Sequence, residues 1–348
     1  MKTLRRTQRP LVEPDREWEK GSELIVVDAI ADEQAGELLV YYFARFPGQP
    51  HANILCLARS TDGYTWTKPD CGDGTNIVMR SSGDEACWRS NTWGEFMPVT
   101  VLKDEREANP ERRWKTLYWD RPNATMPSGI CLATSADGRR WKPRFPQPVI
   151  TSMNDAMSMI AAPVDARSPF GGAFFIYQQT WKYNARLSTA RDSLAGCHRR
   201  ISIWTSSSFG GHWIGPVTIL EPDDEDEPDV QFYWLTPFKR TDGGYGGLLN
   251  CHHTNDQTMD VQLVSSQDGW TWKRENARKP LLGLGPQGRF DSGSVIATAR
   301  PVRWRNKTLL YYRGYATVHD GQLHEPDLPP PNPALGVGLA EFDDELVA

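Results

Sequence analysis

The sequence predicts an all-β fold, a single five-bladed β-propeller with four antiparallel strands in each blade. Two observations carry this prediction. The 348 residues include 14 Trp, 11 Tyr, 29 Gly and 26 Pro, a composition that favours aromatic strands and tight turns over long helices. A Ser-x-Asp-Gly-x-x-Trp box also recurs about every 70 residues, and self-similarity at such a period is typical of repeat folds.

The box begins at Ser60, Ser135 and Ser266, and a degenerate copy begins at Ser207. Asp-Gly supplies the positive φ of a tight turn, and Asp accepts backbone N–H groups. The Trp begins the return strand and packs over the turn. Each box follows a short apolar strand, and these strands cover residues 54–58, 130–134, 201–205 and 261–265.

Two further strands precede each box, and a fifth unit keeps its strands without a box. The expected strands are 24–28, 38–44, 96–102, 114–119, 157–163, 173–178, 230–238, 245–250, 294–302, 308–313 and 336–342. The blades then span about 20–85, 90–150, 155–220, 229–283 and 291–345 of one domain covering 1–348. The last blade needs a strand from the other terminus, and the segment before Leu24 is a candidate.

Composition excludes several function classes. The net charge is −5, and no stretch combines Lys and Arg with aromatics, so we expect no nucleic-acid partner. The basic start lacks a following apolar run, and no 18 apolar residues stand together, so we expect no membrane association, a cytoplasmic location and a monomer or weak homodimer. The six cysteines are scattered, which favours free thiols. We expect no metal and no cofactor.

Five blades with Ser-x-Asp-Gly-x-x-Trp hairpins resemble the furanosidase superfamily of propellers, glycoside hydrolase families 32, 43, 62, 68, 117 and 130. The box is also similar to the Asp box of sialidases, though one residue shorter. The segments 15–19, 227–233 and 288–293 resemble a family-32-like branch. The Trp-Met-Asn-Asp-Pro-Asn-Gly, Phe-Arg-Asp-Pro and Glu-Cys motifs of invertase-type enzymes are missing. The resemblance therefore implies a small carbohydrate substrate and carboxylate catalysis, but no catalytic residue transfers by motif.

One carboxylate stands before the first strand of four blades. In a propeller these strands line the central channel, so the four side chains are expected to converge, and a glycosidase needs an acid and a base or nucleophile around one bond. For the first blade, Glu19 and Asp28 are both candidates. The catalytic candidates are therefore Asp155, Asp229, Asp291, Glu95 and Glu19. Each has a structural alternative, and the box residues Asp62, Asp137 and Asp268 are expected to be structural.

Aromatic and polar residues near these strands are candidates to hold the sugar. Rings stack on the apolar face of a sugar, and arginine binds carboxylate, phosphate or hydroxyl groups. The substrate-binding candidates are Trp93, Arg89, Gln231, Tyr233, Trp181, His252 and Arg313. The alternatives are that the aromatics are core side chains and that the arginines pair with carboxylates. His252 and His253 alternate on a regular strand, so they do not share one metal.

The leading functional hypothesis is a glycoside hydrolase that acts on a small glycoside or oligosaccharide. A glycoside phosphorylase is the alternative within the enzyme class, in which Arg89, Arg313 and His252 bind phosphate. A non-catalytic or repurposed sugar-binding propeller in a biosynthetic pathway is the alternative from another class. Carboxylates without a cationic partner favour catalysis, whereas carboxylates tied to arginine favour a structural role.

Overall fold

The chain is all-β. The computed structural model describes residues 3–88, 94–151, 154–162, 173–183, 194, 196–343 and 346. Within these ranges there are strands and short 3₁₀ segments but no α-helix, which confirms the predicted class. The 3₁₀ segments are η1 (Glu17–Glu19), η2 (Glu85–Cys87), η3 (Pro110–Arg112) and η4 (Asn276–Arg278). None of the helices in the described residues is long and apolar enough to span a membrane.

The chain divides into two compact units, which are described separately. The N-terminal unit, Leu11–Asp155, contains two four-stranded antiparallel sheets whose strands follow chain order. The first sheet is β2 (Glu23–Asp32), β3 (Glu37–Arg45), β4 (Ile54–Ser60) and β5 (Ile77–Arg80). The second is β6 (Met97–Lys103), β7 (Trp114–Asp120), β8 (Gly129–Ser135) and β9 (Lys142–Pro143). Consecutive strands are hydrogen bonded neighbours, as successive hairpins require.

The C-terminal unit comprises Met1–Pro10 and Ala156–Ala348. Its four-stranded sheet is β10 (Met157–Ala161), β11 (Phe174–Tyr183), β12 (Cys197–Ser206) and β13 (Ile214–Leu220). Its second sheet contains β14 (Val230–Lys239), β15 (Tyr245–His253), β16 (Thr258–Ser266), β17 (Lys273–Arg274), β18 (Pro280–Leu282), β19 (Ser294–Ile296), β20 (Val302–Trp304), β21 (Lys307–Tyr315), β22 (Leu335–Phe342) and β1 (Thr3–Arg6).

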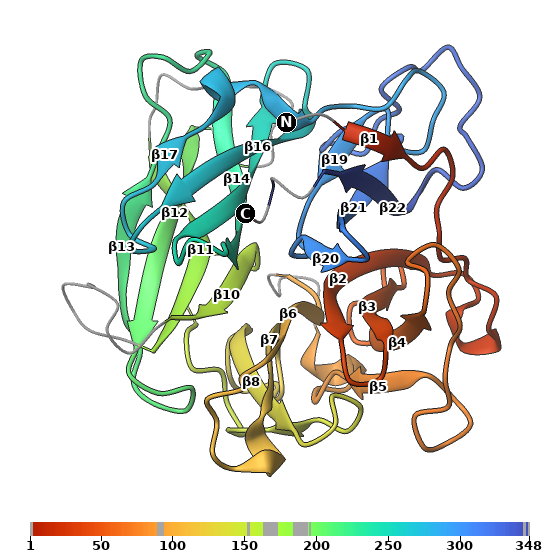
Figure 1. Cartoon of the computed structure of the whole chain (residues 1–348), viewed down its shortest axis with the longest axis vertical. Helices are drawn as coiled ribbons and strands as arrows, with labels where there is room; N and C mark the ends of the chain where they lie inside the picture. The colour runs from red at the N-terminus through yellow and green to blue at the C-terminus, as the bar shows by residue number, and fades with distance from the viewer. Residues whose placement is uncertain are drawn as a thin grey trace. The chain divides into compact units, whose positions relative to one another are not determined.

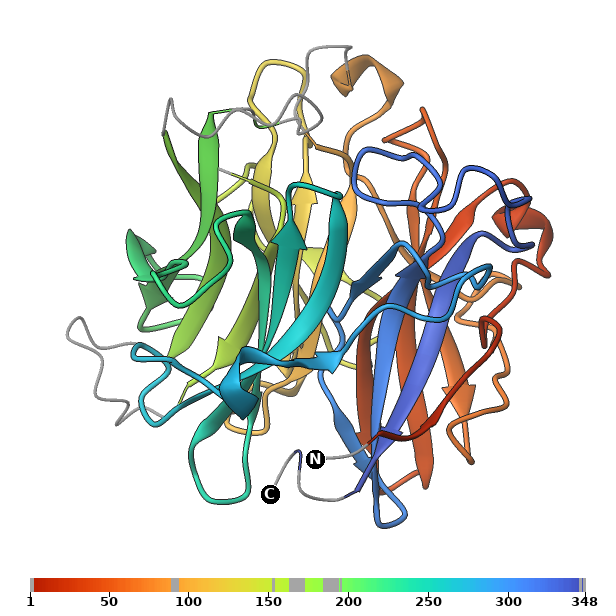
Figure 2. The same ribbon diagram turned by 90° about the horizontal axis from the view of Figure 1, so that it is seen from above.

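The second sheet of the C-terminal unit consists of two antiparallel groups. The group β14–β16 joins the group β19–β22 through a single parallel pair, Met259 with Ser294. The N-terminal strand β1 pairs with β22, so the red and blue ends of the chain lie side by side in Figures 1 and 2. The expected contribution of the segment before Leu24 to the last strands is thus observed.

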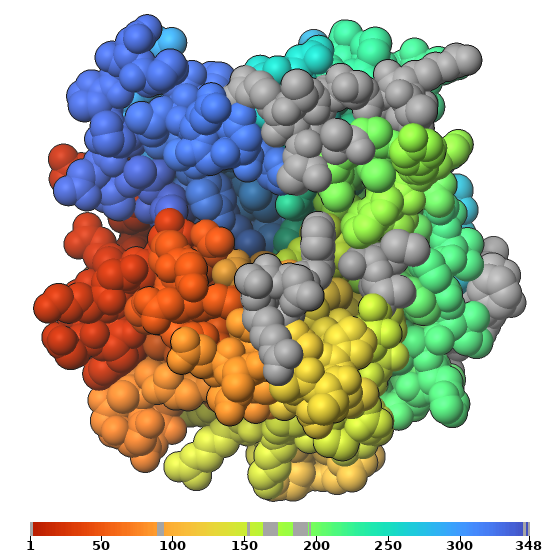
Figure 3. All heavy atoms as spheres, turned by 180° about the vertical axis from the view of Figure 1, so that it is seen from behind, coloured from red at the N-terminus to blue at the C-terminus, as the bar shows by residue number. Residues whose placement is uncertain are grey.

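The central strands are buried on both faces because neighbouring sheets of a unit pack against each other. Strand β3 has the nearly continuous apolar sequence of such a strand, and its residues from Leu38 to Ala44 are all buried. The Tyr41 hydroxyl of β3 donates to the Gly138 carbonyl of the second sheet at 3.1 Å. In Figure 3 the orange-to-yellow atoms of the second sheet accordingly lie directly against the red-to-orange atoms of the first.

The repeated box forms the same turn in its three complete copies. In the first, Gly63 has φ +87°, and the Asp62 carboxylate accepts the backbone N–H groups of Tyr64 and Thr65 at 2.7 Å. The Ser60 hydroxyl completes the turn by donating to Asp62. The same contacts recur at Asp137 and Asp268. These three carboxylates are fully used within their own turns.

The box carboxylates predict a loss of stability in acid. Burial alone would raise the pKa of Asp62, but the hydrogen bonds from Thr65, Tyr64 and Ser60 lower it to about 2. A folded pKa below the unfolded value of about 4 stabilises the fold above pH 4, and this stabilisation is lost as the pH falls toward 2. In urea unfolding, wild type should therefore lose its advantage over Asp62→Asn as the pH falls through this range. A difference independent of pH would contradict this reading.

Two details of the strands differ from the predicted ones. The Trp of the box directly precedes return strands of only two residues, β9 and β17, whereas in the first sheet the return strand β5 begins at Ile77, well after Trp66. The expected strand 294–302 is two strands, β19 and β20, separated by residues 297–301. The prediction of one domain covering 1–348 stays a prediction.

Candidate functional site

A carboxylate lies at the start of the first strand of each group of antiparallel strands. It is either the first residue of that strand or one of the three residues before it. Glu95 precedes β6, Asp155 precedes β10, Asp229 precedes β14 and Asp291 precedes β19. In the first sheet this position belongs to Glu23, the first residue of β2, and not to Glu19 or Asp28. Glu23 was missed because a charged residue at the start of a strand is most often a solvated end.

In the N-terminal unit, Arg45 holds two of these entrance carboxylates. Its Nε lies 2.7 Å from Glu95 Oε1, and its Nη1 lies 3.0 Å from Glu23 Oε2. Burial disfavours the guanidinium charge, but the two carboxylates raise the pKa of Arg45 above its usual value. Asn53, fully buried, donates to the other Glu95 oxygen at 3.1 Å.

Asp155 lies beside the segment that carries Glu95. The Gly94 backbone, with φ +78°, approaches the Asp155 carboxylate so closely that a Cβ atom there would lie 3.1 Å from Oδ2. The same Cβ would lie 2.5 Å from the indole Nε1 of Trp119, a buried residue of β7. The structure therefore places the Asp155 carboxylate against the backbone of Gly94, the residue before Glu95, and only glycine permits this approach. We call Glu23, Arg45, Glu95, Trp119 and Asp155 the carboxylate cluster.

In the C-terminal unit, Tyr233 is the centre of a second group. Register shifts between Phe232 and Trp234, so Tyr233 occupies a β-bulge in β14, and bulges often re-aim side chains at functional sites. The Tyr233 ring centroid lies 6.0 Å from that of His252 and 5.2 Å from that of His319. The two histidine rings lie 4.6 Å apart. Because Tyr233 is only partly buried, this group has an accessible side.

Buried polar side chains contact Tyr233 and its neighbour Gln231. Arg199 is 1% exposed, and its Nη1 donates to Gln231 Oε1 at 2.9 Å. The Arg199 guanidinium lies 5.6 Å from the Tyr233 ring centroid. Gln179 donates to the Tyr233 carbonyl at 3.1 Å, and its buried Oε1 has no hydrogen-bond partner among the described residues. A buried acceptor of this kind is suited to a ligand hydroxyl. We call Tyr233, Gln179, Arg199, Gln231, His252 and His319 the tyrosine cluster.

Asp229 stands at the entrance of β14, two residues before Gln231. The Asn255 N–H donates to Asp229 Oδ2 at 3.2 Å, and the Thr254 N–H donates to the Asp229 carbonyl at 3.0 Å. Among the described residues, no arginine or lysine pairs with the Asp229 carboxylate. Its surroundings therefore differ from those of Glu95, which Arg45 holds at 2.7 Å.

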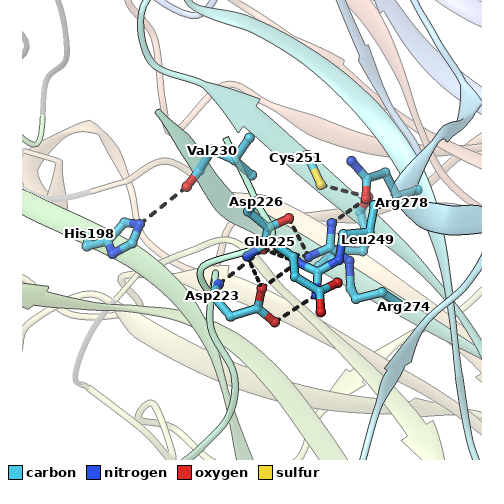
Figure 4. Close-up of polar contacts among 10 residues, drawn as sticks. His198, Asp223, Glu225, Asp226, Val230, Leu249, Cys251, Arg274 and Arg278 are labelled. Carbon is cyan, nitrogen blue, oxygen red and sulfur yellow. Dashed lines mark hydrogen bonds and ion pairs between the residues drawn. The ribbon is translucent and has the colours of Figure 1, made fainter. Parts of the chain in front are cut away.

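The acidic run before Asp229 is mostly exposed, and two arginines bind three of its carboxylates (Figure 4). Arg274 Nη1 lies 2.8 and 2.9 Å from the two oxygens of Asp226, a pair that is almost fully buried. Arg278 binds Asp223 at 2.6 Å, Asp226 at 2.9 Å and Glu225 at 3.1 Å. These ion pairs fix the segment from which β14, with Asp229 and Tyr233, begins.

Asp291 is enclosed by cationic and hydroxyl groups. It is 0% exposed, and Oδ2 lies 2.7 Å from Arg6 Nη2 and accepts the Tyr312 hydroxyl at 2.7 Å. Arg289 Nε lies 3.6 Å from the other oxygen. A carboxylate buried in this way anchors the N-terminal strand β1 to β21, which is the structural alternative for this candidate.

Glu19 lies apart from the other candidates of the N-terminal unit. It is 0% exposed; its Oε2 lies 2.6 Å from Lys68 Nζ, and its Oε1 accepts the Tyr42 hydroxyl at 2.5 Å. Burial, with the nearby Cys56 and Glu19, raises the pKa of the Tyr42 hydroxyl well above its usual value. Glu19 is separated from Glu95 because its partners lie on β3 and after the first box, which also favours its structural alternative.

The remaining candidates fall in three places. Trp181 pairs in register with Arg199 and so adjoins the tyrosine cluster. Arg313 lies 5.3 Å from the Trp234 ring centroid and donates to the Thr298 hydroxyl at 3.0 Å. Arg89 and Trp93 lie outside the described residues. Within the described ranges, no group of three or more His, Cys, Asp or Glu is arranged to hold a metal ion.

Several residues of the two clusters carry only weak signals in the sequence. Arg199 and His319 stand in no motif, and Arg45 ends an apolar strand like many other charged residues. Spacing does not identify them because their partners lie 22 to 86 residues away in the sequence, from Glu23 with Arg45 to Tyr233 with His319. The residues missed by sequence reasoning are Glu23, Arg45, Asn53, Gln179, Arg199 and His319.

Solved structures provide the comparison for this geometry. A glycosyl hydrolase from Bacteroides ovatus matches with a TM-score of 0.60 at 16% identity, over 99% of this chain and 90% of that one. The chain shares the fold of glycoside hydrolases. A structure described for the GH130 family of mannoside phosphorylases, which contains glycoside hydrolases that target β-1,2 mannosidic linkages in Candida mannan, matches at 0.62 with 14% identity over 99% and 94%.

A thermostable family-43 glycoside hydrolase matches with a TM-score of 0.55 at 14% identity, over 92% of this chain and 91% of that one. No protein-family model matches the sequence, and no curated protein matches it. At these identities the structural likeness shows the fold alone. An activity must therefore be argued from the carboxylate and tyrosine clusters.

Proposed function

We propose that the chain is a five-bladed β-propeller glycoside hydrolase that acts on a small glycoside or oligosaccharide. The observation that carries the proposal is the close approach of the Asp155 carboxylate to Gly94, the residue that precedes Glu95. Two carboxylates in unlike surroundings are the requirement for glycoside hydrolysis, in which one protonates the leaving oxygen and the other activates water or attacks the anomeric carbon. The five first strands β2, β6, β10, β14 and β19 support the number of blades.

We assign a catalytic or structural role to each candidate carboxylate from the charged groups around it. Glu95 is held by Arg45 at 2.7 Å, and we assign it the role of base, nucleophile or stabiliser of positive charge in the transition state. Asp155, which belongs to the same unit as Glu95, is the candidate for the other catalytic role, and Asp229 is the candidate carboxylate of the C-terminal unit. Asp291 and Glu19 are buried and ion paired, and we assign them structural roles.

The tyrosine cluster is proposed as the carbohydrate-binding part. The Tyr233 ring offers a face for a sugar ring, and Gln179 Oε1 offers a buried acceptor for a hydroxyl group. Arg199, His252 and His319 carry the alternative, a glycoside phosphorylase, because a guanidinium and imidazoles suit inorganic phosphate. Both reactions need the same acid and differ in the attacking group.

A turnover assay distinguishes these functions. Wild type is incubated with aryl furanosides and pyranosides, with and without inorganic phosphate, beside Asp155→Asn and Asp229→Asn. Hydrolysis that falls about 100- to 10,000-fold in either variant identifies a glycosidase and the carboxylate responsible. Turnover only with phosphate establishes the phosphorylase. The absence of turnover with folded protein, alongside saturable sugar binding that Tyr233→Ala removes, would favour a binding protein instead.

Azide then separates the catalytic roles. A small anion replaces a lost base or nucleophile but not a lost acid, so azide should restore turnover in Glu95→Gln with substrates that carry a good leaving group. An acid variant should instead retain activity on activated aryl glycosides and lose it on natural-type alkyl glycosides. Glu37→Gln, which removes a carboxylate paired with Arg59 away from the cluster, is the matched control.

A further inference from the structure

Gln257 has a left-handed backbone conformation that its residue type rarely adopts. It is the last residue of the turn 254–257 between β15 and β16, its φ is +65°, and its N–H donates to the His253 carbonyl at 2.7 Å. Glycine and asparagine are the usual residues at such a position, because a longer side chain crowds the left-handed backbone. A strained residue in an ordinary hairpin turn therefore points to a use for its conformation.

The side chain of Gln257 stabilises this turn. The side chain is fully buried, and its Nε2 donates to the Thr254 carbonyl at 2.7 Å. Its Oε1 is also buried and has no hydrogen-bond partner among the described residues. Because the amide bonds to the turn that carries it, the turn is rigid and the direction of the Gln257 carbonyl is fixed.

The Gln257 carbonyl accepts the backbone N–H of His319 at 2.8 Å. His319 lies at the tip of a short hairpin after β21, in which Thr317 pairs with Leu323 and the Val318 N–H donates to the Gln322 carbonyl at 2.9 Å. The hydrogen bond thus joins a turn of the group β14–β16 to the group β19–β22. It depends on the left-handed conformation, because φ and ψ set the direction of a backbone carbonyl.

The imidazole of His319 in turn contacts the rings of the tyrosine cluster. Its Nε2 lies 3.3 Å from the Tyr233 hydroxyl, and its ring centroid lies 4.6 Å from that of His252. Tyr233 occupies a β-bulge, where local packing rather than regular strand register sets the direction of a side chain. Two successive contacts therefore connect Gln257 with the Tyr233 ring: carbonyl to N–H, and imidazole to hydroxyl.

We propose that Gln257 is a positioning residue of the tyrosine cluster, whose carbonyl docks His319 so that the imidazole fixes the orientation of the Tyr233 ring. The proposal rests on the proposed function in taking this ring as the platform for the sugar, and it deepens that function by naming a residue that sets affinity through another. A ring held in one orientation loses less freedom when a sugar binds. The docking therefore strengthens binding and leaves the reacting groups unchanged.

Amide hydrogen exchange tests the docking without any substrate. In Gln257→Val, whose branched side chain disfavours the left-handed backbone, exchange of the His319 N–H should accelerate about tenfold or more, while that of Val318, bonded within the hairpin, should change less than about threefold. Gln257→Asn, which tolerates the left-handed backbone, should keep the protection of His319. Equal acceleration of both N–H groups, or a His319 N–H without protection in wild type, overturns the proposal.

Two further variants complete the exchange experiment. Asn306→Val strains another left-handed residue, φ +63°, in the exposed turn between β20 and β21, and it should leave the exchange of His319 and Val318 unchanged. If Gln257→Val does not fold, Gln257→Gly replaces it, because glycine frees the turn without straining it. Gln257→Gly should accelerate the exchange of His319 and not that of Val318, and the opposite result overturns the docking.

Kinetics separate positioning from a general loss of stability. Gln257→Val should raise KM for aryl glycosides about tenfold with kcat within about twofold of wild type, and Gln257→Asn should restore most of the affinity. His319→Ala should raise KM to a similar extent. The double variant Gln257→Val with His319→Ala should bind no more weakly than His319→Ala, because Gln257 acts through His319.

Additive losses in the double variant overturn the positioning role of Gln257. If wild type turns over no glycoside, the proposed function fails, and the exchange of the His319 N–H alone decides the docking.

Discussion

Replacing Arg6 by alanine should destabilise the protein by about 3–5 kcal/mol, the cost of leaving a buried carboxylate without its partner. Asp291 is 0% exposed, and Arg6 supplies its closest cation, at 2.7 Å, together with hydrogen bonds to Tyr312 and to the Gly283 carbonyl. Chemical denaturation measures the loss. Arg9→Ala, at an exposed position a few residues away, should change the free energy of unfolding by less than about 0.5 kcal/mol.

The double variant decides whether charge burial is the cause. In Arg6→Met with Asp291→Asn the buried charge is removed with its partner, so more than half of the lost stability should return. A double variant as unstable as the sum of the single variants would show that Arg6 acts by packing of its stem instead. Either way, the effect should be seen in the unfolding of the C-terminal unit, to which both residues belong.

Replacing Gly94 by alanine should combine a loss of stability of about 3 kcal/mol with a loss of catalytic activity. The new Cβ would meet the buried Trp119 indole at 2.5 Å and the Asp155 carboxylate at 3.1 Å, and the backbone keeps φ +78°. Overpacking and a left-handed alanine cost about 1–3 kcal/mol each. The displaced Asp155 should reduce kcat about 100-fold, because small shifts of catalytic groups are costly.

Gly48→Ala separates crowding from backbone strain. Gly48 has nearly the same φ, +76°, but a Cβ there would meet nothing within 4 Å. This variant should show the strain alone, about 1 kcal/mol, with unchanged activity per folded molecule. Equal losses in both variants would indicate that the Gly94 contacts with Trp119 and Asp155 do not limit the site.

The strands could be predicted from the sequence because their signals are local. The box fixes a turn within seven residues, so the strands before Ser60, Ser135 and Ser266 could be located to within a few residues. Return strands were harder, since β9 and β17 contain two residues each and leave no period to detect. The pairing of β1 with β22 joins residues more than 330 positions apart, which no local pattern specifies.

The entrance carboxylates could also be predicted, but not the groups that surround them. Their position before a first strand is a sequence feature, whereas the ion pairs that hold Glu95 and Asp291 come from Arg45 and Arg6. Such partners are chosen by tertiary packing. For the same reason Glu19, which stands near β2 in sequence, lies against Lys68 and not with Glu95.

The glycine of the box has a second use beyond its turn. The Gly138 carbonyl accepts the Tyr41 hydroxyl from the neighbouring sheet, and the Gly269 carbonyl accepts the Tyr177 hydroxyl in the same way at 2.9 Å. Tyr41 and Tyr177 both lie on the second strand of their sheets, β3 and β11. Two pairs of consecutive repeats are thus joined by the same contact, with a tyrosine donor from one repeat and the carbonyl of a box glycine from the next. A duplicated pair of such repeats would keep this contact within each copy.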